Sequence, residues 1–531
     1  MSFAQKVFPG MYRDSVALMQ LSSTLSNLPG ISQAAAIMAT EANVALLREA
    51  GLLNEDPVAG PNDLLLVIFG ENEQSVVDAL EWTNQSLTRA LNSNGSATDT
   101  QSLPRSLEMA LLEAPGANLA MISCPGEFAG AEALKALHLG LNVMLFSNNV
   151  SIEDEALLKE LGDELDLMVM GPDCGTAIIN GVPLGFANVV SSGNIGLVAA
   201  SGTGLQQVCC LIDRAGAGVS QAIGTGGRDL KSRIGGRTMI KAIKALASDP
   251  GTDVITLISK PPDRDVAERV LEVAGQCGKP VIVNFLGDLN FQTSYQNIFC
   301  AKTLEETAYL AVAKSQTSDA VVESVIRHNQ DLMTIKEMAE SLATDQSCVR
   351  GLYSGGTFAY EAQLLLEPGL GTIQSATPLN VEGKLADAWI SRGHTIVDLG
   401  DDVFTRGRPH PMIDHRLRNE RIVQEAEDPE TGIILLDVVL GYGAHEDPAA
   451  VMAPAIMAAQ QVARESDRTI HFVAFVCGTM SDPQDFLRQE KTLVDVGVIL
   501  TENNAQAVRL AMDIVLEKAA CLSGESGNLA I

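Results

Sequence analysis

Short apolar runs alternate with amphipathic helical stretches along nearly the whole chain of 531 residues. This alternation is typical of parallel α/β sheets, in which each buried strand is connected to the next by a helix that covers the sheet. Residues 1–190 are expected to form one domain, with strands at QAAAIMAT, DLLLVIFG, NLAMISC, NVMLFSN and DLMVMGP. Two further units are expected at 191–312 and 348–521, joined by a helical connector at 313–347.

The second and third units resemble each other. NIGLVAASGTGLQQ matches RGLYSGGTFAYEAQ, LASDPGTDVITLIS matches EAEDPETGIILLDVV, and KPVIVNFLGD matches RTIHFVAFVCGT. Because these segments recur in the same order, the sequence indicates an internal duplication of one α/β unit.

Charge and cysteine usage limit the partners that the chain is expected to have. The formal net charge is −30, from 66 acidic and 36 basic residues, and aromatic residues make up 4%. Without a basic cluster, this excess of negative charge disfavours nucleic acid and anionic membranes. The nine cysteines show no CxxC pair or metal-ligand spacing. With no signal peptide and no apolar run long enough to cross a bilayer, we expect a cytoplasmic protein with reduced thiols and no metal.

Two equivalent loops, one at the head of each duplicated unit, are candidate anion sites. Each follows a buried strand and opens a helix, where backbone N–H groups and the helix dipole favour a phosphate or carboxylate. The candidate phosphate-binding residues of these loops are Ser201, Gly202 and Thr203 in the first, and Ser354, Gly355, Gly356 and Thr357 in the second. If the units pair about a pseudo-twofold axis, both helices point at one anion. The alternative is a tight turn with a hydroxyl at the helix N-cap.

A glycine-rich segment after the next strand is a further candidate. Gly226 and Gly227 permit close approach of the backbone to a ligand, and Arg228 suits two-pronged binding of phosphate or carboxylate. The alternative is a surface loop in which Arg228 pairs with Asp229.

Acidic, basic and imidazole groups crowd the third unit between Asp398 and His415. His410, Arg408 and the more distant His445 are candidates for catalysis or anion binding, because they follow strands at the edge where open α/β sheets hold ligands. No HxH or HxxxH pattern favours a metal, and surface or capping histidines are the alternative. Cys174 is expected to be buried rather than reactive.

MGPDCGTAI, GNIGLVAASGTG and AIGTGGRDL, in this order, resemble the α-subunit of succinyl-CoA synthetase, and the third unit is similar to the ligase domain of that enzyme's β-subunit. With SKPP, DLGDD and GRPHPMID, the fused arrangement resembles the FdrA family of acyl-CoA synthetase-like proteins. The resemblance implies a Rossmann-like CoA-binding domain followed by two flavodoxin-like ligase domains. It also implies a CoA cleft, at the matching residues Ser123, Pro125, Gly126, Ser147, Asn148 and Asn149.

The chain departs from the synthetase at its covalent machinery. The synthetase carries a phosphohistidine in a loop whose counterpart here, GDLNFQTSYQNIFCAKT, has no histidine, and Ser259 and Lys260 stand near the place of the Glu that steadies it. The early phosphate loop is replaced by GMYRDSVALMQLSS, and no segment matches an ATP-grasp module. ATP-driven acyl-CoA formation by this chain alone is therefore not expected.

Three functions stay open on this basis. The first is transfer of a carbamoyl or other acyl group to phosphate, as in the ureide catabolism that the family resemblance implies, where a carbamoyl group passes between oxamate and phosphate with partner subunits. The second is a CoA-dependent acid–thiol ligase whose ATP-grasp module comes from a partner chain. The third is a CoA- or phosphate-binding assembly subunit without catalysis. Self-association is compatible with each.

Overall fold

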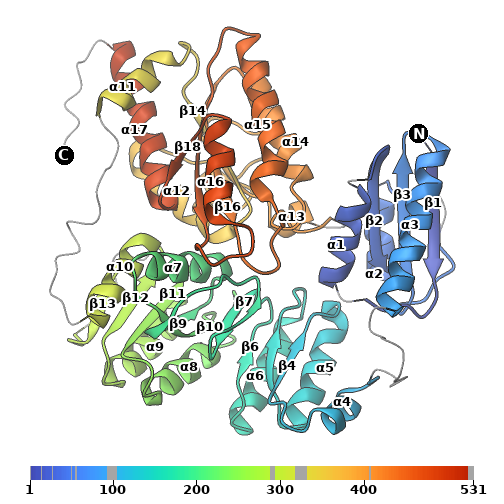
Figure 1. The fold of residues 1–531 in the computed structure, drawn as a ribbon. Coiled ribbons are helices and arrows are strands. Elements are labelled where there is room, and N and C mark those ends of the chain that lie inside the picture. Colours follow the sequence, from blue (N-terminus) through green and yellow to red (C-terminus); the bar gives the residue numbers. More distant parts are fainter. Residues whose placement is uncertain are drawn as a thin grey trace.

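The computed structural model describes residues 2–13, 15–26, 28–49, 51–53, 57–92, 104–287, 294–316, 332–405 and 408–523. Its strands form four sheets, of three, three, seven and five strands (Figure 1). In the part of the chain described, no helix is long and apolar enough to cross a membrane.

A three-stranded antiparallel sheet with the order β1-β3-β2 forms the first unit. Its elements are β1 (Ser2–Phe8), α1 (Ser15–Ser26), β2 (Ile31–Met38), α2 (Glu41–Glu49), β3 (Leu64–Gly70) and α3 (Glu73–Asn92). Along β3, Leu64, Leu66 and Ile68 pack into one apolar cluster and Leu65 and Val67 into another. Both faces of this sheet are therefore covered, and in Figure 1 the unit stands apart from the rest of the chain.

The second sheet is parallel, with the order β4-β5-β6. Its elements are α4 (Leu107–Glu113), β4 (Leu119–Ile122), α5 (Gly126–His138), β5 (Asn142–Leu145), α6 (Ile152–Glu164) and β6 (Val169–Met170). Ser151 caps α6 by accepting a hydrogen bond from Asp154 N. The expectation of one Rossmann-like sheet over residues 1–190 is thus replaced by two separate sheets. The alternation of strands and helices is the same in both, and it does not reveal that the first sheet is antiparallel.

The third and fourth sheets are copies of one topology. The third contains β7 (Thr176–Ile179), β8 (Val182–Gly185), β9 (Ser192–Ala199), β10 (Val219–Gly224), β11 (Val254–Ser259), β12 (Val281–Phe285) and β13 (Ile298–Cys300). The fourth contains β14 (Cys348–Tyr353), β15 (Thr395–Asp398), β16 (Thr431–Val439), β17 (His471–Cys477) and β18 (Val498–Thr501). Numbered within each copy, the shared strands follow the order 2-1-3-4-5, which is the flavodoxin-like arrangement. The β7–β8 hairpin, expected in the first domain, extends the third sheet beside β10.

Helices cover both duplicated sheets. Those of the first copy are α7 (Gly202–Arg214), α8 (Arg237–Ser248), α9 (Arg264–Gln276) and α10 (Leu304–Ser315). Those that follow are α11 (Leu332–Ser341), α12 (Gly356–Leu370), the 3-10 turn η2 (Val381–Gly383), α13 (Asp402–Thr405), α14 (Arg416–Glu427), α15 (Pro448–Arg464), α16 (Phe486–Asp495) and α17 (Asn504–Ser523). Much of the expected connector, 317–331, lies outside the described residues, as do 93–103.

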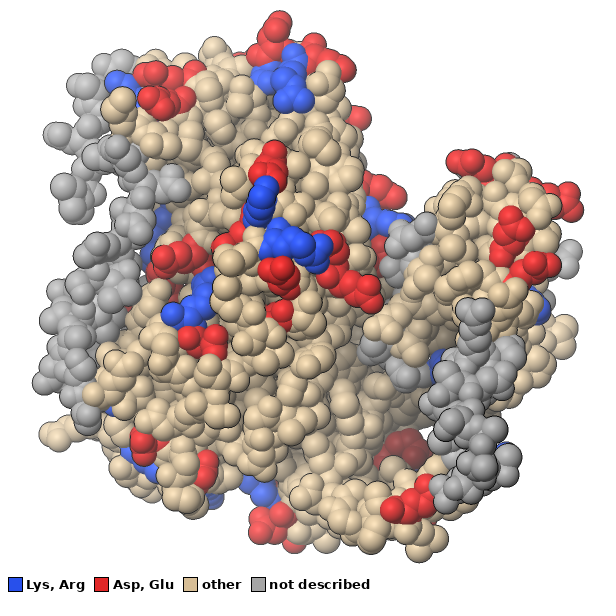
Figure 2. Space-filling model, in the orientation of Figure 1, with Lys and Arg blue, Asp and Glu red and all other residues tan. Residues whose placement is uncertain are grey.

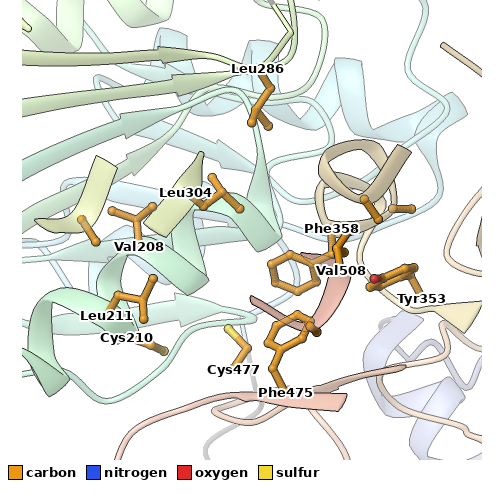
Figure 3. Packing of buried hydrophobic residues seen from close by; sticks show 14 of the residues in the cluster. Val208, Cys210, Leu211, Leu286, Leu304, Tyr353, Phe358, Phe475, Cys477 and Val508 are labelled. Carbon is orange, nitrogen blue, oxygen red and sulfur yellow. The ribbon is translucent and has the colours of Figure 1, made fainter. Parts of the chain in front are cut away.

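One apolar core joins the two copies. A single cluster of buried residues includes Val208 and Leu211 of α7, Phe358 of α12 and Phe475 of β17 (Figure 3). The rings of Phe358 and Phe475 meet edge to face with centroids 5.0 Å apart. The copies therefore pack directly on each other through α7 and α12.

On the molecular face in Figure 2, most Lys and Arg side chains stand beside Asp and Glu side chains. On this face the basic side chains are thus interspersed with acidic ones.

Candidate functional site

The N-termini of α7 and α12 meet at the junction of the two copies. Ser201 is the N-cap of α7, where its Oγ accepts a hydrogen bond of 3.0 Å from Gly204 N. The same Oγ lies 2.6 Å from Thr357 Oγ1 in the first turn of α12. A Cβ built on Gly355, the N-cap of α12, would lie 2.9 Å from Thr203 Cγ2, so this close approach requires glycine. Two positive helix ends and two hydroxyls thus converge on one place.

Ser354 does not share this place, although the sequence predicts it as an anion ligand. Its backbone N–H donates to Asp437 Oδ1 at 2.8 Å and its hydroxyl donates to Asp437 Oδ2 at 2.7 Å. Asp437 lies in the middle of β16 and forms a fully buried ion pair with Arg418 at 2.7 Å. Ser354 is therefore held by the sheet, and Thr357 provides the hydroxyl of the second copy.

Asp398, at the end of β15, lies against the first turn of α12. One oxygen accepts a hydrogen bond of 2.9 Å from Gly400 N, and the other lies so close to Gly356 that a Cβ there would collide with it. Burial raises the pKa of Asp398 to about 7, against the opposing effects of the Lys260 charge and the Gly400 N–H. This carboxyl group is thus partly protonated near neutral pH.

His410 lies beside Asp398. A Cβ built on Gly400 would lie 2.7 Å from His410 Nε2 and 3.1 Å from Asp398 Oδ1, so the two side chains border the same point. His410 Nδ1 accepts a hydrogen bond from Met412 N, and the ring packs on Phe186 with centroids 5.8 Å apart. Because burial lowers the pKa of His410 to about 4, the ring is neutral at pH 7 and its proton is on Nε2.

The glycine-rich segment lies next to Asp173, which follows β6. Gly226 has a φ of +86°, and a Cβ there would collide with the backbone of Pro172. Asp173 is exposed. Desolvation, followed by the charge of Asp402, nevertheless raises its pKa to about 6, while Arg228 and Lys260 act in the opposite direction.

Arg228 pairs with a residue other than Asp229, the partner in the alternative interpretation of this loop. It donates to Val150 O at 2.8 Å and forms an ion pair of 2.9 Å with Glu155, while its side chain stays 43% exposed. Buried Lys159 bridges Glu155 at 3.1 Å and Asp229 at 2.8 Å. This network fixes α6 of the second sheet to the loop after β10, and it leaves part of the guanidinium accessible.

The two candidate CoA loops lie together at the carboxyl ends of β4 and β5. A Cβ built on Gly126 would collide with the backbone of Asn148 and Asn149. Ser147 Oγ donates to Cys124 O, and Asp173 N donates to Ser147 O at 3.0 Å. Ser123 and Pro125 belong to the same turn, with Pro125 as the N-cap of α5. The structure therefore brings this set together and connects it to Asp173.

The other predicted catalytic residues lie elsewhere. Arg408 stacks over the Trp389 ring, with its Cζ 5.4 Å from the ring centre. His445 packs edge to face on His415 at 5.5 Å, and its Nδ1 accepts a hydrogen bond from Asp447 N. Burial lowers the pKa of His445. Among the described residues, no group of three or more His, Cys, Asp or Glu side chains is placed to hold a metal ion.

Three residues were not selected as site residues from sequence: Asp398, beside the first turn of α12, Asp173, and Lys260, whose charge acts on both carboxyl groups. Lys260 follows β11, and its Nζ lies 5.3 Å from the centre of the Tyr360 ring. Each of them lies at or just after the carboxyl end of a strand. Because open α/β sheets bind ligands at this edge, that position could have identified them from the sequence. Cys174 is buried, as expected, and desolvation raises its pKa to about 12.

Two known families match parts of the chain. The family described as CoA-ligase matches residues 352–514. The family described as AllF, heavy metal-associated domain, matches residues 1–103. Residues 1–103 contain no Cys and no His, which are the thiolate and imidazole ligands that soft metal ions prefer. The residues of the first unit therefore do not fit a heavy-metal site.

The protein YahF of Escherichia coli (strain K12) is 42% identical over 520 residues, which cover 97% of this chain and 99% of YahF. The α1 subunit of the ADP-forming succinate–CoA ligase of Archaeoglobus fulgidus is 29% identical over 175 residues, covering 32% of this chain and 58% of that subunit. The corresponding subunit of Methanothermobacter thermautotrophicus is 28% identical over 174 residues, covering 32% and 57%.

Two solved structures with low sequence identity are among those similar to this chain. The apo form of the dinucleotide-forming acetyl-coenzyme A synthetase 1 of Ca. Korarchaeum cryptofilum has 14% identity and a TM-score of 0.28, covering 78% of this chain and 86% of that one. ATP citrate lyase of Methanothrix soehngenii in complex with citrate and coenzyme A has 19% identity and a TM-score of 0.31, covering 39% and 36%.

Proposed function

This chain belongs to the FdrA family of acyl-CoA synthetase-like proteins, which are related to succinyl-CoA synthetase, and from that membership we propose that it transfers a carbamoyl or other acyl group to phosphate at the paired N-termini of α7 and α12. The observation that carries the proposal is the 2.6 Å approach of Ser201 Oγ and Thr357 Oγ1 between two facing helix ends. Each end supplies about half a positive charge, and the N–H groups at the start of a helix suit a phosphate group.

The loss of the covalent relay supports transfer to free phosphate. In this family's ligase relatives a histidine carries the phosphoryl group, but the counterpart segment, residues 287–303, has no histidine. Phosphate at the helix ends is then the group that accepts the acyl or carbamoyl group directly. The family resemblance favours a ureide substrate, with carbamoyl transfer between oxamate and phosphate in a complex with partner subunits.

Calorimetric titration of the purified chain with phosphate, carbamoyl phosphate and CoA tests the proposal. We expect phosphate and carbamoyl phosphate to bind and Thr357→Val to weaken both. The proposal fails if neither ligand binds to the wild type, or if binding is unchanged in a Ser201→Ala/Thr357→Val double variant.

A CoA-dependent acid–thiol ligase with an ATP-grasp partner is the second candidate. It is favoured by the contact between the Ser123–Gly126 and Ser147–Asn149 loops, where the resemblance implies a CoA cleft. Gly126→Ala would force these loops apart, because a Cβ there collides with the facing backbone. If this candidate is correct, wild-type protein binds CoA and the Gly126→Ala variant does not. Absence of CoA binding, with and without the partner chain, removes it.

A further inference from the structure

The two duplicated copies differ at one equivalent position. Gly224 on β10 pairs with Ala199, which precedes the N-cap Ser201 by two residues, and Asp398 on β15 pairs with Tyr353, which precedes the N-cap Gly355 by two residues. Asp398 therefore occupies the place of Gly224. In the first copy no side chain fits there, because a Cβ on Gly224 would collide with Thr176 O and Cys174 Sγ.

The site is consequently asymmetric. The positions after Gly224 are Gly226, Gly227 and Arg228, and the equivalent positions after Asp398 are Gly400, Asp401 and Asp402. The first half offers backbone N–H groups and a guanidinium, which bind an anion. The second half offers carboxyl groups, which accept and donate protons. The second half therefore sets a proton-exchanging group, Asp398, beside the paired helix ends, where the proposed function binds phosphate.

Asp398 is the carboxyl group of the second half that touches the helix end, since a Cβ on Gly356 would collide with it. The charged and titratable groups facing Asp398 come from several elements. They are Lys260 after β11, Asp401 of its own loop, Asp437 of β16 and His410 before α14. The neutral His410 ring borders the same point as Asp398 Oδ1, so it lies beside the carboxyl group without adding a charge.

We propose that Asp398 carries a proton between the phosphate and the leaving nitrogen when a carbamoyl group passes from an amide-type nitrogen to phosphate. A phosphate oxygen bonds to the carbonyl carbon, and the carbon–nitrogen bond breaks with its electron pair going to nitrogen. Nitrogen takes the proton held by Asp398, and the proton of the phosphate O–H returns to Asp398. The products are carbamoyl phosphate and the amine or amide, and no proton is gained or lost. This inference rests on the proposed function.

The test uses the full chain with its partner subunits and measures phosphate release from carbamoyl phosphate and oxamate, the reverse reaction. General acid–base groups contribute about 100-fold or more, so Asp398→Asn is expected to lower the transfer rate by at least about 100-fold. Phosphate binding, measured by calorimetry, should change much less than the transfer rate, because Asp398→Asn leaves the hydroxyls and N–H groups of both helix ends in place. The matched control is Asp345→Asn, which makes the same change at an exposed residue and should leave the transfer rate unchanged.

The pH profile is the second measurement, and it needs no variant. Wild-type transfer should change with an inflection near pH 7, the pKa raised by burial of Asp398. The inference is overturned if Asp398→Asn keeps the wild-type rate, or if the wild-type rate shows no inflection in this range. If wild-type protein neither binds phosphate nor transfers the carbamoyl group, the proposed function itself fails. Phosphate binding and transfer by wild type, with full activity in Asp398→Asn, overturns only the role of Asp398.

Discussion

Ser201 Oγ and Thr357 Oγ1 lie 2.6 Å apart although 156 positions separate them in the chain. The contact places the positive ends of two helices close together, and a Cβ built on Gly204 would lie 3.1 Å from Thr357 Cγ2. Like partial charges repel, and an anion between them converts that repulsion into attraction. The relationship therefore predicts how anion binding and stability respond to changes at this junction.

Thr357→Val removes one hydroxyl and keeps the shape of the side chain. We expect phosphate binding to weaken by about tenfold, the size of one hydrogen bond to a charged group. Isothermal calorimetry measures the affinity, and Thr492→Val, which changes an exposed helix hydroxyl, is the control. Equal affinity in the wild type and Thr357→Val would contradict the placement of phosphate at this junction.

Arg418→Met is expected to destabilise the second duplicated copy, residues 348–521, strongly. Arg418 and Asp437 are both fully buried, and Asp437 also holds Ser354. Removing one partner of a buried pair leaves an uncompensated charge and typically costs about 3–5 kcal/mol. Denaturant unfolding measures the loss. Arg264→Met, which breaks an exposed pair with Glu268, should change stability by less than about 0.5 kcal/mol. A similar small change for Arg418→Met would contradict the prediction.

The stability contribution of His410 depends on pH. Burial lowers its pKa in the folded protein to about 4, below the ordinary value of 6.5. Between these values the unfolded chain binds a proton that the folded chain does not, so stability is lost as pH falls from about 6.5 to about 4. Relative to His410→Gln, the wild type should lose on the order of 2 kcal/mol over this window, because the ring keeps some solvent contact. Denaturant unfolding at several pH values measures this difference. If the unfolding free energies of the wild type and His410→Gln fall by the same amount between pH 7 and pH 4, the account is contradicted.

Thiol labelling should distinguish the cysteines by burial. Cys300 and Cys521 are exposed, whereas Cys174, Cys209 and Cys210 are buried. A buried thiol with a raised pKa reacts only after local opening, so its labelling should be at least about 100-fold slower. The Cys300→Ser/Cys521→Ser variant should lose the fast phase seen with a thiol reagent under native conditions. Fast labelling of Cys174 would restore the alternative of a reactive thiol there.

The duplication was predictable because strand, small-residue loop and helix recur in the same order in both copies. Burial of the strands followed from the same pattern: Thr431–Val439 is an almost uninterrupted apolar run and is buried throughout. The antiparallel sheet formed by β1, β2 and β3 was not predictable in this way. The alternation of strands and helices does not distinguish antiparallel from parallel pairing, and the strand Ser2–Phe8 is partly polar.

The side chains of the site were harder to predict than its loops. Ser354 looked equivalent to Ser201, but its hydroxyl is taken by Asp437, which is 83 residues away in the chain. Asp398 looked like one of several acidic residues, and only the strand registers show that it replaces Gly224 of the other copy. Such differences depend on long-range contacts, which no local pattern encodes.

The apolar core around Phe358 and Phe475 belongs to both copies at once. Neither copy can unfold without exposing the apolar face of the other. The two copies should therefore unfold in one cooperative transition, which calorimetry measures. If the chain were cut within the connector, each half would present that face to water, and the halves should associate as obligate partners do. In thermodynamic terms, the duplicated part of this protein is a heterodimer held on one chain.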